Sequence, residues 1–218
     1  MIISRERRYV FVHIPKTGGT SLSLALEQRA MKDDILLGDT PKAKRRRNRA
    51  KSLSARGRLW KHSTLADIDG VLTADEVKDM FTFTLVRNPW DRMVSYFHWL
   101  QDQDFDHPAV SLAKALPFED FVLHPATLRS FHNHPARQYM TTAEGQERCR
   151  AYIRLEHFEQ DAEPLFAHLG FRFDLPRLNP SVRSEGYRQY YSDRTASAIA
   201  RACTEDIDRF GYQFDPPS

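Results

Sequence analysis

Apolar residues along the chain fall into short runs that alternate with segments of helical character. Two runs, Arg8–His13 (RYVFVH) and Phe81–Val86 (FTFTLV), are rich in β-branched and aromatic residues and have the length of buried strands. A third strand is predicted at Tyr152–Leu155. Strands that alternate with helices indicate an α/β fold with a central, mostly parallel sheet flanked by helices.

The helical segments have recognisable ends. The expected helices are one after the first strand, with apolar residues at 22–26, and others at 74–80, 89–100, 159–169 and 192–210. The segment 73–76 has the spacing of a capping box, and Asn88 can cap a helix whose first residue is Pro89. Gly170 and Gly211 are predicted to end the last two helices.

Composition adds limits on the class of protein. With 218 residues, 41% of them hydrophobic, the chain fits a single domain over 1–218. The 32 basic and 29 acidic side chains leave a net charge of +3, which does not indicate nucleic acid as a partner. Basic residues concentrate at 38–58, which is predicted to be an exposed loop insertion. Its positive segment 42–51 is either simply solvated or attractive to an anionic acceptor.

Targeting and metal signals are missing from the sequence pattern. The first residues, MIISRERRYV, lack the apolar core of a signal peptide, and no run reaches the roughly 18–20 apolar residues of a membrane span. A cytoplasmic protein without a membrane span is therefore expected. Cys149 and Cys203 are expected to be unreactive thiols, and no His or Cys pattern has metal-ligand spacing.

The stretch Val10–Leu26 (VFVHIPKTGGTSLSLAL) carries the first candidate site. Its loop consists of Lys16, Thr17, Gly18, Gly19, Thr20 and Ser21. At a strand-to-helix turn the first helical N–H groups lack intrahelical acceptors, and adjacent glycines allow close approach of a phosphate. The lysine precedes the glycines, unlike in the nucleotide-triphosphate P-loop, which argues against the usual magnesium arrangement. The alternative is an ordinary tight turn.

Two motifs together carry a family resemblance. PKTGGTSL near the N-terminus and LVRNPWDRMVSYF further on resemble the sulfotransferases that use 3′-phosphoadenosine 5′-phosphosulfate (PAPS). The likeness extends to IRLEHFEQD and YYSDRTASAIARACTEDIDRFGYQF. It is strongest to the carbohydrate branch, which includes heparan and chondroitin sulfotransferases and bacterial relatives. The resemblance implies a P-loop-like fold of three layers, PAPS as the donor and no metal.

The resemblance also assigns roles to residues of the donor site. Lys16–Ser21 would hold the 5′-phosphosulfate, and Arg87 and Ser95 would hold the 3′-phosphate. Arg87 ends a predicted strand, where ligands of open α/β sheets bind, and a guanidinium can grip a phosphate with two hydrogen bonds. The alternative for Arg87 is an ion pair with Asp91. Arg183, in NPSVRSEGY, would be a second contact to the 3′-phosphate or else an exposed loop arginine.

Transfer to an alcohol also needs a base. Histidine suits this role because its ordinary pKa of about 6.5 leaves it mostly neutral at pH 7. His62, in LWKHSTLADI, occupies the place where the resembled carbohydrate sulfotransferases keep their base. Lys16 would stabilise the charge that develops on the leaving phosphate. The alternative for His62 is a polar residue beside a helix capped by Ser63, in which case His13 or Glu156 becomes the candidate base.

Three functions are therefore considered. The first is a sulfotransferase that moves a sulfuryl group by in-line displacement to a hydroxyl acceptor, for which the resemblance favours a saccharide. The alternatives are a nucleotide-dependent kinase with a similar sheet and a non-catalytic protein that binds the nucleotide or sulfated glycans. Because acceptor pockets are built from variable loops, a small alcohol, a lipid-linked sugar or a peptide tyrosine also remain candidate acceptors.

Overall fold

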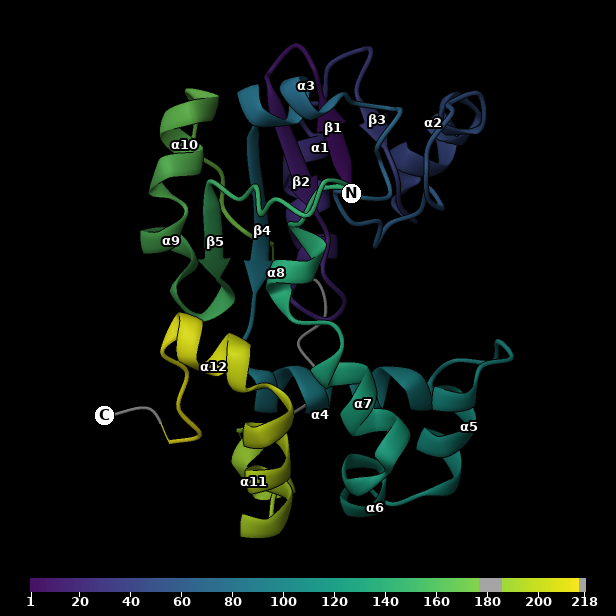
Figure 1. Ribbon diagram of the computed structural model, residues 1–218, viewed down its shortest axis with the longest axis vertical. Coiled ribbons are helices and arrows are strands. Elements are labelled where there is room, and N and C mark those ends of the chain that lie inside the picture. Colours follow the sequence, from purple (N-terminus) through teal and green to yellow (C-terminus); the bar gives the residue numbers. More distant parts are fainter. Residues whose placement is uncertain (177–185, 216–218) are drawn as a thin grey trace. The chain divides into compact units, whose positions relative to one another are not determined.

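The computed structural model describes residues 1–176 and 186–215, and the chain divides into two compact units (Figure 1). The first unit comprises Met1–Val86 and Ala136–Leu178, and the second comprises Arg87–Pro135 and Asn179–Ser218. All strands of the described residues belong to the first unit, whereas the described part of the second is helical.

The first unit is built on a sheet that has five strands among the described residues, in the order β3-β1-β2-β4-β5. The strands are β1 (Ile2–Ser4), β2 (Tyr9–Val12), β3 (Ile35–Leu36), β4 (Phe81–Val86) and β5 (Ala151–Arg154). β2 pairs in parallel with β4, and β4 with β5, whereas β1 is antiparallel to both of its neighbours. Only β1 therefore runs against the other strands, and the expectation of a mostly parallel sheet is confirmed.

Helices cover this sheet to give the expected three-layer α/β fold. They are α1 (Gly19–Glu27), α2 (Pro41–Lys51), α3 (Ala74–Asp79), α8 (Ala136–Tyr139), α9 (Phe158–Asp161) and α10 (Glu163–Leu169), with a 3₁₀ turn η1 (Leu155–His157). Tyr9 and Phe11 of β2 belong to a buried cluster with residues of α1 and α10. Val10 and Val12 point to the opposite face and are also 0% exposed, so both faces are covered. Figure 1 shows α9 and α10 along the β5 edge.

Two strands were not predicted from the sequence. β1 has three residues and β3 has two, which is too short for an alternating pattern to be recognised. Both are held by pairing: Ile2 lies opposite Phe11 on one side and opposite Leu36 on the other. The N-terminal residues therefore complete the sheet through long-range contacts that a local pattern does not encode.

The prediction of a loop over the basic segment was wrong for residues 41–51, which form the helix α2. Thr40 caps this helix by accepting a hydrogen bond from the Ala43 N–H at 3.1 Å, and Pro41 takes a position where its missing N–H has no cost. Arginine, lysine and alanine are good helix formers even without an apolar face. Three of the basic side chains also donate to carbonyl oxygens of the last residue of α1 and of the segment that follows it. The pairs are Lys42 with Glu27, Arg46 with Met31 and Arg49 with Lys32.

The second unit consists of helices in its described part. They are α4 (Pro89–Gln101), α5 (Pro108–Ala115), α6 (Phe118–Leu123), α7 (Pro125–His132), α11 (Asp193–Ala202) and α12 (Thr204–Phe210), with a 3₁₀ turn η2 (Tyr187–Tyr190). Asn88 caps α4, as predicted, by accepting from the Trp90 N–H at 3.1 Å. Aromatic rings of α4, α6 and α7 form the interior: Tyr96 lies 5.7 Å from Phe131, and Phe97 lies 5.1 Å from Phe121.

Two segments expected to be single helices are each divided in two. The first breaks at Ala162, between α9 and α10, because Pro164 cannot donate an N–H within a continuous helix. The second breaks at Cys203, where the Thr204 hydroxyl bonds to the Ala200 carbonyl oxygen at 3.0 Å and competes with the helical pattern. Gly170 and Gly211 end α10 and α12 in the left-handed conformation, as expected.

Candidate functional site

The loop between β2 and α1 has an unusual backbone. Lys16 has a φ of 65°, and Gly18 has a φ of 87°. A positive φ causes little strain in glycine, but it raises the conformational free energy of a lysine by roughly 1–2 kcal/mol. Thr17 is 2% exposed, and its hydroxyl donates to the Ile14 carbonyl oxygen at 2.9 Å, which ties the loop to the end of β2. The loop is therefore anchored by a buried hydrogen bond from Thr17.

The helix that follows the loop begins without a side-chain cap. Gly18 occupies the N-cap position, and a glycine has no side chain that could accept the first N–H groups of α1. Thr20 is exposed and Ser21 is half-buried, so both hydroxyl-bearing residues lie in the accessible first turn. Together with the helix dipole, these groups make the start of α1 suited to an anion.

Packing also requires both glycines. A Cβ atom on Gly18 would lie 2.9 Å from a methyl group of Leu155, and one on Gly19 would lie within 3.0 Å of three atoms of the His13 ring. The His13 side chain is 6% exposed and stacks on Phe11 with ring centroids 5.9 Å apart. The glycine pair therefore allows α1 to begin directly against a buried histidine.

Replacement of Gly19 by alanine is expected to lower the free energy of unfolding by roughly 1–3 kcal/mol, because the new methyl group must displace the His13 ring. Chemical denaturation measures this change. Gly38→Ala is the matched control, since its Cβ would meet only Ala43 at 4.0 Å. Equal effects of the two substitutions would contradict the packing described here.

His62 lies beside the start of this loop. Its Nδ1 atom is 2.7 Å from the His13 carbonyl oxygen, and the two imidazole rings meet edge to face with centroids 4.6 Å apart. A carbonyl oxygen can only accept, so Nδ1 of His62 carries the hydrogen. In the neutral ring the basic lone pair is then on Nε2. This is the tautomer that a proton acceptor at Nε2 requires.

His13 has a different electrostatic environment. Burial lowers the pKa of His13 well below its ordinary value, and the nearby positive charges, including Lys16, lower it further. The ring is therefore neutral at pH 7 and a weak base. Glu156, the other alternative base considered from the sequence, is exposed in η1. Of the three candidates, His62 has the geometry best suited to accept a proton.

Arg87 and Ser95 belong to the second unit. Arg87 follows the last residue of β4 directly, and its Nε and one terminal nitrogen donate to the same Asp91 oxygen at 2.9 and 2.6 Å. The ion pair considered as an alternative is thus present, and it orients the guanidinium. Ser95 is a half-buried residue of α4, two turns beyond Arg87. Arg183 lies outside the described residues.

Cys203 is buried, which raises the pKa of its thiol to about 12, so it is uncharged at neutral pH. In the described ranges, no group of three or more His, Cys, Asp or Glu side chains is arranged to hold a metal ion. No helix in this part of the chain is both long enough and apolar enough to cross a membrane.

Comparison with known proteins identifies the family. The model of the sulfotransferase family matches residues 1–213. The chain belongs to the sulfotransferase family. None of the curated proteins compared with it matched. Among solved structures, it is similar to mouse sulfotransferase SULT7A1 complexed with PAP, with 14% identity, a TM-score of 0.47, and coverage of 94% of this chain and 84% of that chain. The assignment rests on the family match, because the structural likeness is too weak to carry it.

The sulfotransferase match includes every residue predicted for the site, although it does not assign their roles. Within the first unit, the structure brings the Lys16–Ser21 loop, His13 and His62 together. Sequence reasoning missed Trp60, whose ring lies 5.0 Å from that of His62. An aromatic residue two positions before the candidate base was the available signal, but spacing alone does not reveal that the side chain is exposed.

Proposed function

We propose that this sulfotransferase moves a sulfuryl group from PAPS to the hydroxyl group of a saccharide. The start of α1 is the observation that carries the proposal: a glycine-capped helix, preceded by a lysine with a left-handed backbone, packs against His13, and the His13 ring contacts that of His62. Family membership supports sulfuryl transfer as the reaction class. The resemblance to the carbohydrate branch supports the saccharide.

The donor would be held through its phosphates. Lys16 to Ser21 would bind the 5′-phosphosulfate, with Lys16 supplying charge, the first helical N–H groups supplying donors, and Thr20 and Ser21 supplying hydroxyls. Thr17 would contribute its backbone N–H, because its hydroxyl already donates within the loop. Arg87 and Ser95 would bind the 3′-phosphate. By the resemblance, Arg183 would be a second contact to that phosphate.

The chemistry needs one proton acceptor and one stabilised leaving group. The acceptor oxygen attacks sulfur as the bond between sulfur and the 5′-phosphate oxygen breaks, and the electron pair of that bond stays on the phosphate. His62 would take the hydroxyl proton at Nε2, and Lys16 would stabilise the new charge on the phosphate. The products are the sulfate ester and adenosine 3′,5′-bisphosphate (PAP), and this sequence of steps requires no enzyme nucleophile.

Binding of PAP is the first test. With PAP at 100 times its Kd, mass action should stabilise the folded protein by about 2.7 kcal/mol. For a chain of this size we expect the Tm to rise by roughly 5–10 °C. A thermal melt with and without millimolar PAP measures the shift. An unchanged Tm would contradict the donor assignment.

A transfer assay separates the enzyme from the two alternatives. Wild-type protein is incubated with ³⁵S-labelled PAPS and a panel of oligosaccharides in EDTA, without ATP. Labelled sugar is expected, because the proposed steps use neither magnesium nor ATP. A parallel incubation with γ-³²P-labelled ATP and magnesium tests the kinase, which would place ³²P but no ³⁵S on the sugar. PAP binding without label transfer to any acceptor would indicate the non-catalytic nucleotide-binding protein.

A further inference from the structure

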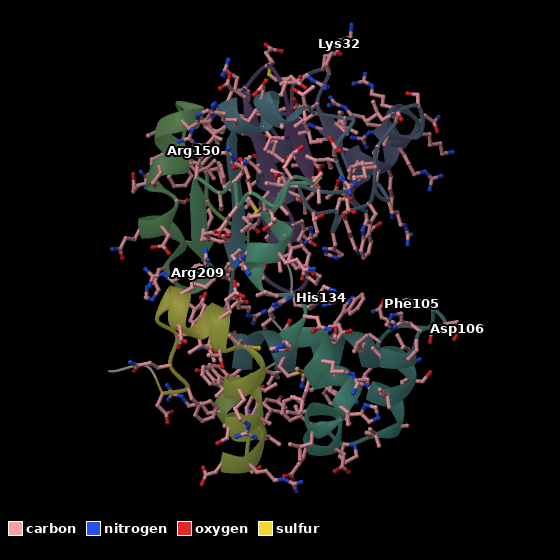
Figure 2. All side chains as sticks on the ribbon, viewed as in Figure 1. Lys32, Phe105, Asp106, His134, Arg150 and Arg209 are labelled. Carbon is pink, nitrogen blue, oxygen red and sulfur yellow. The ribbon has the colours of Figure 1, made fainter. Side chains whose placement is uncertain are left out.

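Trp60 has an exposed indole ring beside the candidate base His62. Among the described residues, two large hydrophobic side chains are exposed, Trp60 at 41% and Phe105 at 48%. Figure 2 shows Phe105 beside Asp106 on the segment between α4 and α5. A single exposed aromatic ring is common in proteins, so exposure alone assigns nothing. What distinguishes Trp60 is the hydrogen-bonded turn that carries it and the residues beside it.

The support of Trp60 is a turn closed by a buried serine. Ser63 is 0% exposed, and its Oγ accepts from the Trp60 N–H at 2.9 Å and lies 2.8 Å from the Arg58 carbonyl oxygen. On the other side, the Gly57 N–H donates to the Asp67 carbonyl oxygen at 3.0 Å. Hydrogen bonds therefore hold the backbone on both sides of Arg58 and Trp60, and the exposed indole is presented from this hydrogen-bonded turn.

The neighbours of Trp60 combine an aromatic surface, a cation and the proposed base. The Arg58 guanidinium lies over the indole, 5.3 Å from its ring centroid, and the His62 ring meets the indole at 88° with centroids 5.0 Å apart. An indole offers a flat apolar surface with one N–H donor at its edge. A guanidinium binds carboxylate or sulfate with two parallel hydrogen bonds. Together these groups match a sugar ring that carries an acidic substituent.

We propose that Trp60 and Arg58 form the acceptor subsite for an acidic pyranose. The exposed part of the indole contacts the apolar C–H surface of the sugar ring, and Arg58 pairs with its carboxylate or sulfate group. The sugar hydroxyl is then held near His62. This inference rests on the proposed function, since it names the acceptor class and two residues that select it.

The test is calorimetric titration in the presence of saturating PAP, using a chondroitin hexasaccharide and neutral maltohexaose. Wild-type protein is expected to bind the acidic sugar more tightly. Trp60→Ala should weaken binding of the chondroitin hexasaccharide by about tenfold or more, and Trp60→Phe should recover part of that loss. Arg58→Gln should weaken binding of the acidic sugar alone, about fivefold to tenfold. Phe105→Ala, the matched exposed aromatic, should leave both affinities unchanged.

The outcomes separate this inference from the donor assignment. Affinities of Trp60→Ala within twofold of wild type would overturn the subsite. The subsite would also be overturned if wild-type protein bound neither hexasaccharide. If PAP still raised the Tm of that protein, the donor assignment would stand. Tighter binding of hexathymidylate, with the same dependence on Trp60, would assign the surface to single-stranded nucleic acid and also overturn the proposal. Absence of any PAP response would instead count against the proposed function.

Discussion

Replacing His62 by alanine is expected to lower the rate of sulfuryl transfer by about 10²–10⁴, the usual effect of removing a general base. The fold should persist, because the lost hydrogen bond between Nδ1 and the His13 carbonyl oxygen contributes only about 0.5–1.5 kcal/mol. Single-turnover kinetics with labelled PAPS measures the rate, and addition of imidazole to the assay should restore part of it.

His168→Ala is the matched control for this substitution. His168 also has a ring nitrogen, Nε2, at hydrogen-bond distance from a backbone carbonyl oxygen, that of Arg7 at 2.9 Å, and it belongs to the same unit. Its replacement should leave the transfer rate unchanged. Near-native turnover by His62→Ala would exclude His62 as the base. Glu156 would then be the stronger of the two remaining candidates, because His13 is buried and its pKa is lowered.

Replacing Lys16 by glycine should separate activity from stability. Glycine adopts the left-handed φ of 65° at this position without strain, so the free energy of unfolding should stay equal or rise by up to about 1 kcal/mol. Transfer should fall by about 10²–10³, because the group that stabilises the leaving phosphate is lost. Denaturant unfolding and single-turnover rates of one protein preparation measure both effects.

Arg8→Gly provides the control for Lys16→Gly. Arg8 is the other described non-glycine residue with positive φ, at 54°, and it lies in the turn between β1 and β2. Its side chain is 63% exposed, so its ion pair with Asp79 contributes little. We expect a similar change in stability with transfer unchanged. A Lys16→Gly protein with full activity would mean that the left-handed lysine is only a feature of the turn.

The sequence predicted those parts of the fold that local patterns encode. The strands at 9–12 and 81–86 and the capped start of α4 follow from β-branched residues and from the pair Asn88 and Pro89. β1 and β3 were missed because their stability comes from pairing across the sheet. The helix α2 was missed because its basic side chains bind backbone carbonyls and form no apolar stripe.

The site was predicted unevenly for similar reasons. Lys16 and the glycine pair could be recognised because a strand-to-helix loop has a local pattern. The contact between His62 and His13 joins residues 49 positions apart, and no spacing rule predicts it. Trp60 could not be assigned from the sequence because its significance depends on exposure and on the ring contact with His62.

The decisive measurement compares two nucleotides across three proteins by calorimetric titration. PAP and adenosine 5′-phosphate differ by one 3′-phosphate, so wild-type protein should bind PAP about 10–100 times more tightly. Arg87→Gln should remove most of this ratio, whereas Lys16→Ala should weaken both nucleotides by a similar factor. In Arg87→Gln, a general loss of structure would instead lower both affinities and leave the ratio of the two affinities unchanged. If Arg87→Gln retains the full ratio, or if Lys16→Ala binds both nucleotides as wild type does, these two residues do not hold the two ends of one donor.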